Sequence, residues 1–70
     1  MNYFELYEKS KQVTLGSTWN DWVLATLKII IIERKGTRIT YRFTNYDSPG
    51  TFECSIFPLL RKSTKVRDSV

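Results

Sequence analysis

Four consecutive isoleucines, Ile29 to Ile32, constrain the fold of this chain more than any other feature of its sequence. They lie in a run from Thr26 to Glu33 that is rich in β-branched residues, which lose χ1 freedom in a helix but fit a pleated sheet. The apolar stretch around them, from Trp22 to Ile32, is interrupted by Lys28. A membrane span needs about 20 consecutive apolar residues. The sequence therefore predicts a central β-strand and no membrane segment.

The residues after this run indicate a β-hairpin. Polar or basic residues alternate with apolar ones from Arg38 to Thr44, as in a half-buried strand. Gly36 can take the positive φ that a tight turn requires. A two-residue loop at Lys35-Gly36 sets three cross-strand pairs: Ile32 with Ile39, Ile30 with Tyr41, and Lys28 with Phe43. This register predicts that Ile30 and Ile32 are buried.

A third strand is predicted over Thr51 to Phe57, after the turn at Ser48-Pro49-Gly50 and before Pro58. It extends the meander through three further pairs: Phe43 with Phe52, Tyr41 with Cys54, and Ile39 with Ile56. The predicted buried face consists of Ile30, Ile32, Ile39, Tyr41, Phe43, Phe52, Cys54 and Ile56. The opposite face carries Ile29, Ile31, Arg38, Thr40, Arg42, Glu53, Ser55 and Phe57. That second face is either partly covered or a basic, partly apolar binding surface.

The lid of the apolar face is predicted to come from an N-terminal helix or from the Trp19–Trp22 segment. Asn2 and Glu5 have the spacing of a capping box, which indicates a short amphipathic helix over about residues 3–12. Its apolar cluster comprises Tyr3, Phe4, Leu6 and Tyr7. This cluster is expected to pack on the core, and the alternative is that the helix docks into a groove of a partner. Residues 13–15 fit a brief strand, and residues 17–21 are interpreted as a turn with a strand after it. Whether 18–25 is helix or strand stays open.

The predicted fold class is α+β, with a short N-terminal helix packed on an antiparallel β-meander of three or four strands. Residues 1–60 are expected to form a single small domain, because 70 residues cannot support a second core. Residues 61–70 are expected to be a basic, flexible C-terminal tail.

Composition excludes most enzyme classes. The chain has no histidine and a single cysteine, so imidazole acid–base chemistry, an internal disulfide and a zinc site of cysteine and histidine are ruled out. Cys54 lies among apolar strand residues and is interpreted as buried and inert. We expect no enzymatic activity, catalytic residue, metal or cofactor. The lone thiol and the lack of a signal peptide predict a cytoplasmic location, and a monomer is favoured.

The charge pattern points to binding. The net charge is +4, with residues 28–42 summing to +4 and residues 61–70 to +3, while residues 43–60 between them sum to −2. Cations beside aromatic rings suit nucleic acid or a protein partner. One or both tryptophans are expected to close the core. The candidate partner-binding residues are Arg34, Lys35, Arg38, Arg42, Trp19, Trp22, Tyr46, Arg61 and Lys62.

In size, charge and lack of catalytic groups, the chain resembles the small proteins that bacteriophages use to bind and redirect host machinery, such as regulators of host RNA polymerase. The resemblance is one of general character rather than of a motif. It implies a protein that binds a component of the host transcription machinery and alters or inhibits its activity. A DNA- or RNA-binding module built on the 34–42 hairpin and the tail is the alternative. Self-association through an exposed strand edge is a third hypothesis.

Overall fold

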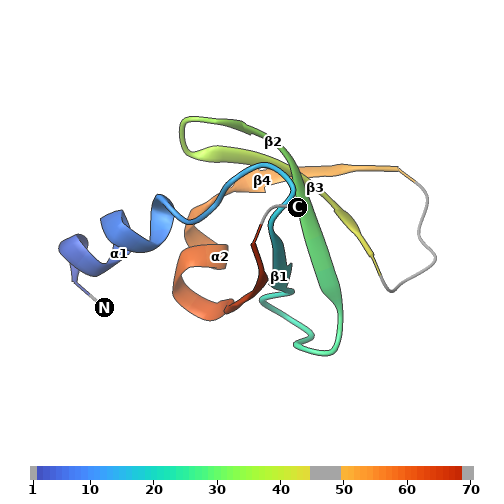
Figure 1. Ribbon diagram of the computed structural model, residues 1–70, viewed down its shortest axis with the longest axis horizontal. Helices are drawn as coiled ribbons and strands as arrows, with labels where there is room; N and C mark the ends of the chain where they lie inside the picture. The colour runs from blue at the N-terminus through green and yellow to red at the C-terminus, as the bar shows by residue number, and fades with distance from the viewer. Residues whose placement is uncertain (1, 45–49, 69–70) are drawn as a thin grey trace.

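The computed structural model describes residues 2–44 and 50–68, which form a five-stranded antiparallel sheet with two short helices (Figure 1). In chain order the elements are α1 (Tyr3–Ser10), β1 (Thr18–Asn20), β2 (Lys28–Lys35), β3 (Arg38–Phe43), β4 (Phe52–Ser55), α2 (Phe57–Lys62) and β5 (Lys65–Arg67). The strand order across the sheet is β4-β3-β2-β1-β5. The predicted α+β class is confirmed, and the sheet has five strands rather than three or four.

The β2–β3 hairpin forms, but with a different register from the predicted one. Lys35 pairs with Arg38, so the loop is Gly36-Thr37, with Gly36 at a φ of 60°. A β-bulge between Ile31 and Glu33 then shifts the pairing by one residue. Moving the loop by one residue along the chain shifts the cross-strand pairing by two residues, which leaves the same side chains on each face of β2. The bulge reduces this shift to one residue. A shift of one residue exchanges the isoleucines between the two faces of the sheet.

The buried isoleucines are therefore Ile29 and Ile31, whose exposed fractions are 0% and 1%. The prediction that Ile30 and Ile32 are buried is wrong: Ile30 is half-buried and Ile32 is 40% exposed. The same bulge brings Arg34 onto the inner face, where it lies opposite Ile39.

The pairing of β3 with β4 keeps the predicted face with a shifted register. Tyr41 pairs with Phe52 and Ile39 pairs with Cys54, two residues away from the predicted partners. Because the shift is an even number, the apolar side chains still share one face. Phe43, Phe52 and Cys54 lie at the margin of the core rather than inside it, with Phe52 39% exposed.

The core lies between the inner face of the sheet and α2. Its buried apolar residues are Val13, Trp19, Ile29, Ile31, Ile39, Tyr41, Ile56, Leu59 and Leu60. Leu59 and Leu60 come from α2, whose first turn contains Pro58, a favoured residue there because no helical hydrogen bond is lost. The prediction that α1 forms the lid is wrong, since α1 contains no buried residue. Only Leu6 of α1 packs against the core.

The segment before β2 also differs from the prediction. Residues 18–20 are the strand β1, and the residues after them form a loop. The Asp21 carboxylate starts this loop by accepting hydrogen bonds from the backbone N–H groups of Val23 and Leu24, each at 3.0 Å. Such local bonds offer the backbone an alternative to a ladder. Residues 13–15 are likewise not a strand.

The C-terminal residues extend the domain beyond the boundary predicted at residue 60. α2 runs across that position to Lys62, and β5 pairs antiparallel with β1. The predicted flexible tail is therefore wrong for residues 61–67. Within the described ranges, 2–44 and 50–68, no helix is long and apolar enough to cross a membrane.

Candidate interaction surface

An exposed aromatic face on α1 is the most unusual surface feature. Tyr3, Phe4 and Tyr7 are 91%, 71% and 61% exposed. Successive helical residues are separated by about 100°, so these three rings occupy one arc of α1. We call them the α1 aromatic face. The helix begins where the Asn2 side chain accepts a hydrogen bond of 2.8 Å from the Glu5 backbone N–H, as the capping-box spacing predicts.

Polar contacts attach α1 to the rest of the domain. The Arg34 guanidinium donates to the backbone oxygens of Ser10 and Val13 and, at 2.6 Å, to the Ser10 hydroxyl. Lys9 donates to the backbone oxygen of Ser63 at 2.6 Å, just after α2. Both cations satisfy carbonyl groups at the end of a helix, where positive charge is favourable. Partial burial lowers the pKa of Lys9 from its ordinary value.

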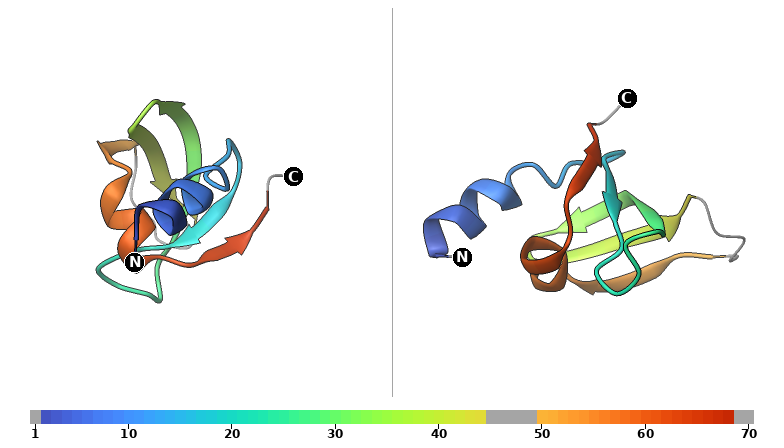
Figure 2. Two further views of the ribbon diagram at one scale, coloured as in Figure 1. Left: turned by 90° about the vertical axis from the view of Figure 1, so that its left-hand side faces the viewer. Right: turned by 90° about the horizontal axis from the view of Figure 1, so that it is seen from below.

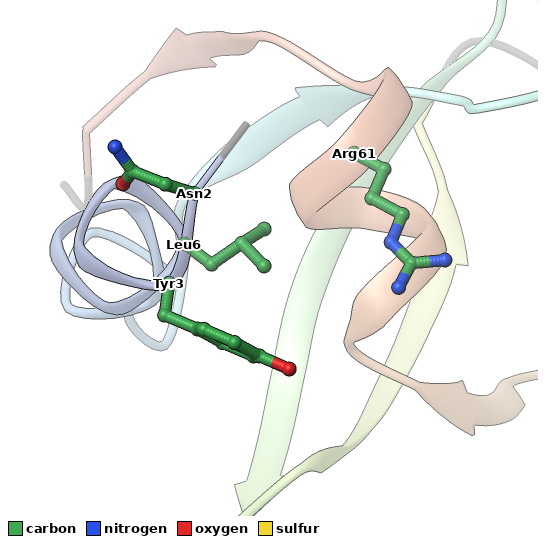
Figure 3. Close-up of a pocket in the computed structure, with 4 residues that line it drawn as sticks. All are labelled: Asn2, Tyr3, Leu6 and Arg61. Atoms are coloured by element: carbon green, nitrogen blue, oxygen red, sulfur yellow. The ribbon is translucent and has the colours of Figure 1, made fainter.

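A groove of about 610 Å³ separates α1 from α2 and is lined by Asn2, Tyr3, Leu6 and Arg61. Figure 3 shows the Tyr3 ring and the Leu6 side chain on one wall and the Arg61 guanidinium on the other. Within the described ranges no acidic side chain pairs with Arg61. The groove can therefore hold an apolar group beside a negatively charged one.

The predicted basic hairpin is less available than its sequence suggests. Lys35 and Arg38 are exposed but form ion pairs, Lys35 with Glu33 at 3.2 Å and Arg38 with Glu53 at 2.8 Å. Arg34, expected to be accessible, is half-buried beneath α1. Of the four predicted hairpin cations, two are thus paired with carboxylates and a third is directed inward.

The remaining hairpin cation is Arg42, which is exposed and has no ion-pair partner among the residues described. Arg61 and Lys62 are both exposed on α2 and not on a tail. The structure therefore separates the predicted site residues into two regions, the hairpin and the α1–α2 end of the molecule.

The two tryptophans face inward. Trp19 is 0% exposed, which confirms the expectation that a tryptophan closes the core and removes Trp19 from the accessible surface. Its indole N–H donates to the Ser17 hydroxyl at 3.0 Å. Trp22 is half-buried and meets Tyr41 edge-on, with ring centroids 5.3 Å apart. Tyr46 lies outside the described residues.

No reactive group stands out in the part of the chain that the structure describes. Burial raises the pKa of the Cys54 thiol and of the Tyr41 hydroxyl, which disfavours their ionised, nucleophilic forms at neutral pH. Residues 2–44 and 50–68 contain no group of three or more histidine, cysteine, aspartate or glutamate side chains able to hold a metal ion.

Comparisons with known proteins add no relatives: no family model, no curated protein and no solved structure matches this chain.

The sequence favoured burial of the α1 rings over their docking into a partner groove, because an amphipathic helix usually turns its apolar arc toward the domain. The arc of α1 that faces the domain carries Leu6, Lys9 and Ser10, two of which are polar. Apolar side chains normally occupy that arc. No sequence signal indicates that Arg34 and Lys9 replace apolar burial here, since both contacts are made to backbone oxygens of distant residues.

Proposed function

We propose that this protein is a non-enzymatic regulator that docks the α1 aromatic face, together with Arg61, onto a partner protein. The observation that supports this most is the exposure of three large rings on a helix that has no fully buried residue. Exposing such rings on a folded domain is unfavourable unless a partner covers them. Tyrosine and arginine are also among the residues that dominate binding energy at protein interfaces.

The partner that suits this surface is a protein with a carboxylate set among apolar side chains. Arg61 and Lys62 would face the carboxylate while the rings cover the apolar part. A component of the host transcription machinery, RNA polymerase in particular, is our candidate, because the chain resembles bacteriophage regulators in size and charge. In this proposal the complex forms in the cytoplasm and inhibits or redirects the polymerase.

Direct binding of DNA or RNA is the second candidate. Aromatic rings beside cations also stack and neutralise single-stranded nucleic acid. The Lys11 ammonium lies 4.4 Å from the centre of the Tyr7 ring, and it also pairs with Glu8 at 3.5 Å. The hairpin supports this candidate less, because Lys35 and Arg38 are paired with carboxylates and Arg34 is directed inward. Binding through phosphates would weaken steeply with salt.

The test compares two double variants for binding to purified RNA polymerase and to a single-stranded oligonucleotide. Phe4→Ala with Tyr7→Ala removes most of the α1 aromatic face without touching the core. Val23→Ala with Leu24→Ala is the matched control, because these side chains are also exposed, at 76% and 56%, but lie in the β1–β2 loop. We expect the first pair to weaken polymerase binding at least about tenfold and the second to leave it unchanged.

Equal effects of the two pairs, or no effect of either, would contradict a role for α1. Tight oligonucleotide binding that falls steeply with salt and needs no polymerase would favour the nucleic-acid candidate.

A further inference from the structure

The sheet has two open edges. In the order β4-β3-β2-β1-β5, each of the three inner strands has a neighbour on both sides, whereas β4 and β5 have one neighbour each. The two edge strands do not pair with each other in the part of the chain that the structure describes. Figure 2 shows them running in different directions, with α2 between them in the chain.

The β4 edge offers free backbone groups. The Ile56 N–H donates to the Thr37 carbonyl at 2.7 Å just beyond the end of the β3–β4 ladder. Hydrogen-bonded and non-bonded pairs alternate in an antiparallel ladder, so the backbone groups of Glu53 and Ser55 point away from β3. Natural edge strands are commonly protected by proline, lysine or other charged residues, by a cover or by short length, and β4, with four residues, has only its length and Glu53. The sequence of β4, Phe-Glu-Cys-Ser, contains neither proline nor lysine, and Phe52 is 39% exposed.

The β5 edge is short and basic. Its central residue, Val66, is 50% exposed and lies at a register shift against β1. Arg67 is exposed at the end of the strand and pairs with Thr18 of β1. Lys65 pairs with Asp68 at 2.6 Å and its side chain is only 18% exposed, so the positive charge that this edge presents is that of Arg67.

The charges of the two edges lie on the same face of the sheet. Glu53 pairs with Thr40, and Arg67 pairs with Thr18, which itself pairs with Ile30. Ile30 pairs with Arg42, two residues along β3 from Thr40 and so on the same side of the sheet. Glu53 and Arg67 thus both belong to the outer face, which is opposite to the core.

We propose that copies of this chain associate head to tail, with β4 of one copy pairing with β5 of the next. Joining the two edges would place Glu53, which also pairs with Arg38 of its own chain, beside Arg67 on the outer face and would cover Phe52 and Val66. Pairing like edges is disfavoured, because two β4 strands would oppose Glu53 to Glu53 and two β5 strands would oppose Arg67 to Arg67. The unlike pairing leaves a free β4 and a free β5 at its ends. Repetition therefore closes a ring or extends a filament, in contrast to the monomer that the sequence favours.

Charge reversal tests this pairing through light scattering coupled to size-exclusion chromatography. We expect the wild-type chain at a concentration of about 100 µM to have a light-scattering mass above that of a monomer. A high concentration is needed because small interfaces are typically weak. Glu53→Arg and Arg67→Glu should each raise the dissociation constant about tenfold or more. An equimolar mixture of the two variants should assemble again, because every β4–β5 contact then joins unlike charges.

Arg38→Gln is the matched control. Like Glu53→Arg, it breaks the ion pair between Arg38 and Glu53, but it leaves the charges of Glu53 and Arg67 in place. Circular dichroism must show that all variants fold. A wild-type chain that stays monomeric overturns the proposal, as do folded variants whose mixture does not reassemble. The Phe4→Ala, Tyr7→Ala chain should assemble normally, so this proposal and the proposed function can fail separately.

Discussion

Replacing Arg34 with methionine should release α1 from the domain while leaving the sheet folded. Methionine keeps an unbranched apolar stem but removes the guanidinium that donates to Ser10 and Val13. A hydrogen bond from a charged donor contributes about 1.5–3 kcal/mol, and these bonds share one half-buried group, so we expect a total of about 2–4 kcal/mol. Half-burial of Leu6, the main apolar contact of α1, contributes only about 1 kcal/mol. The Lys9 hydrogen bond to Ser63 remains in the variant, but it is one bond against the three that Arg34 donates, so Arg34 makes the largest contribution to the docking of α1.

Amide hydrogen exchange measures this release directly. Helices shorter than about 12 residues are marginal in water, so α1, with eight residues, should unfold once it is undocked. A loss of 2 kcal/mol corresponds to about 30-fold less protection of the α1 amides, with the β2 and β3 amides unchanged. Arg42→Met is the control, because Arg42 is an exposed cation on the outer face. Full protection of α1 in the Arg34 variant, or equal loss throughout the sheet, would refute the reasoning.

Three further predictions test the fold. Ile29→Asp should prevent folding, because it buries an unpaired carboxylate at a position with 0% exposure, whereas Ile32→Asp, at 40% exposure, should fold with a thermal midpoint near that of the wild type. Gly36→Ala should cost about 1 kcal/mol in urea unfolding, because its φ of 60° strains any side chain although no atom lies within 4 Å of the new Cβ. Labelling of Cys54 by a thiol reagent should be slow at neutral pH and should accelerate at a higher pH than for a free thiol, because burial raises its pKa; fast labelling at pH 7 would contradict this burial.

The strands of the hairpin could be predicted from the sequence, but the face that they bury could not. β-branched and alternating residues identify β2 and β3 because those patterns act locally. The bulge next to Ile32 depends on tertiary packing. It leaves one residue of β2 without a partner in the ladder and places Arg34 beneath α1. A run of four isoleucines gives no alternation that would reveal such a slip. Ile39, Tyr41 and Ile56 are therefore correctly predicted to be buried, whereas the buried and the outward-facing isoleucines of β2 are exchanged.

The helix α2 was missed for a similar reason. A proline can end a strand or begin a helix. The sequence alone favours the end of a strand at Pro58, because alternating residues precede it, whereas in the structure Pro58 lies in the first turn of α2. The basic residues after Leu60 then resemble a solvated tail. In the structure they are held because β5 pairs with β1, a contact between segments more than 40 residues apart that no local pattern encodes.

If the protein binds a partner through α1, as we propose, the attachment of this helix has a consequence for how the target could change. Arg34 and Lys9 attach α1 to the domain mainly through hydrogen bonds to main-chain oxygens, which every residue possesses. Positions 3, 4 and 7 are then free to vary, because their side chains take no part in holding the helix. New recognition sequences could be exchanged on this helix without redesigning the domain beneath it. Under the proposed function, the domain is a scaffold with a replaceable binding segment, a property that both natural selection and a protein engineer could exploit.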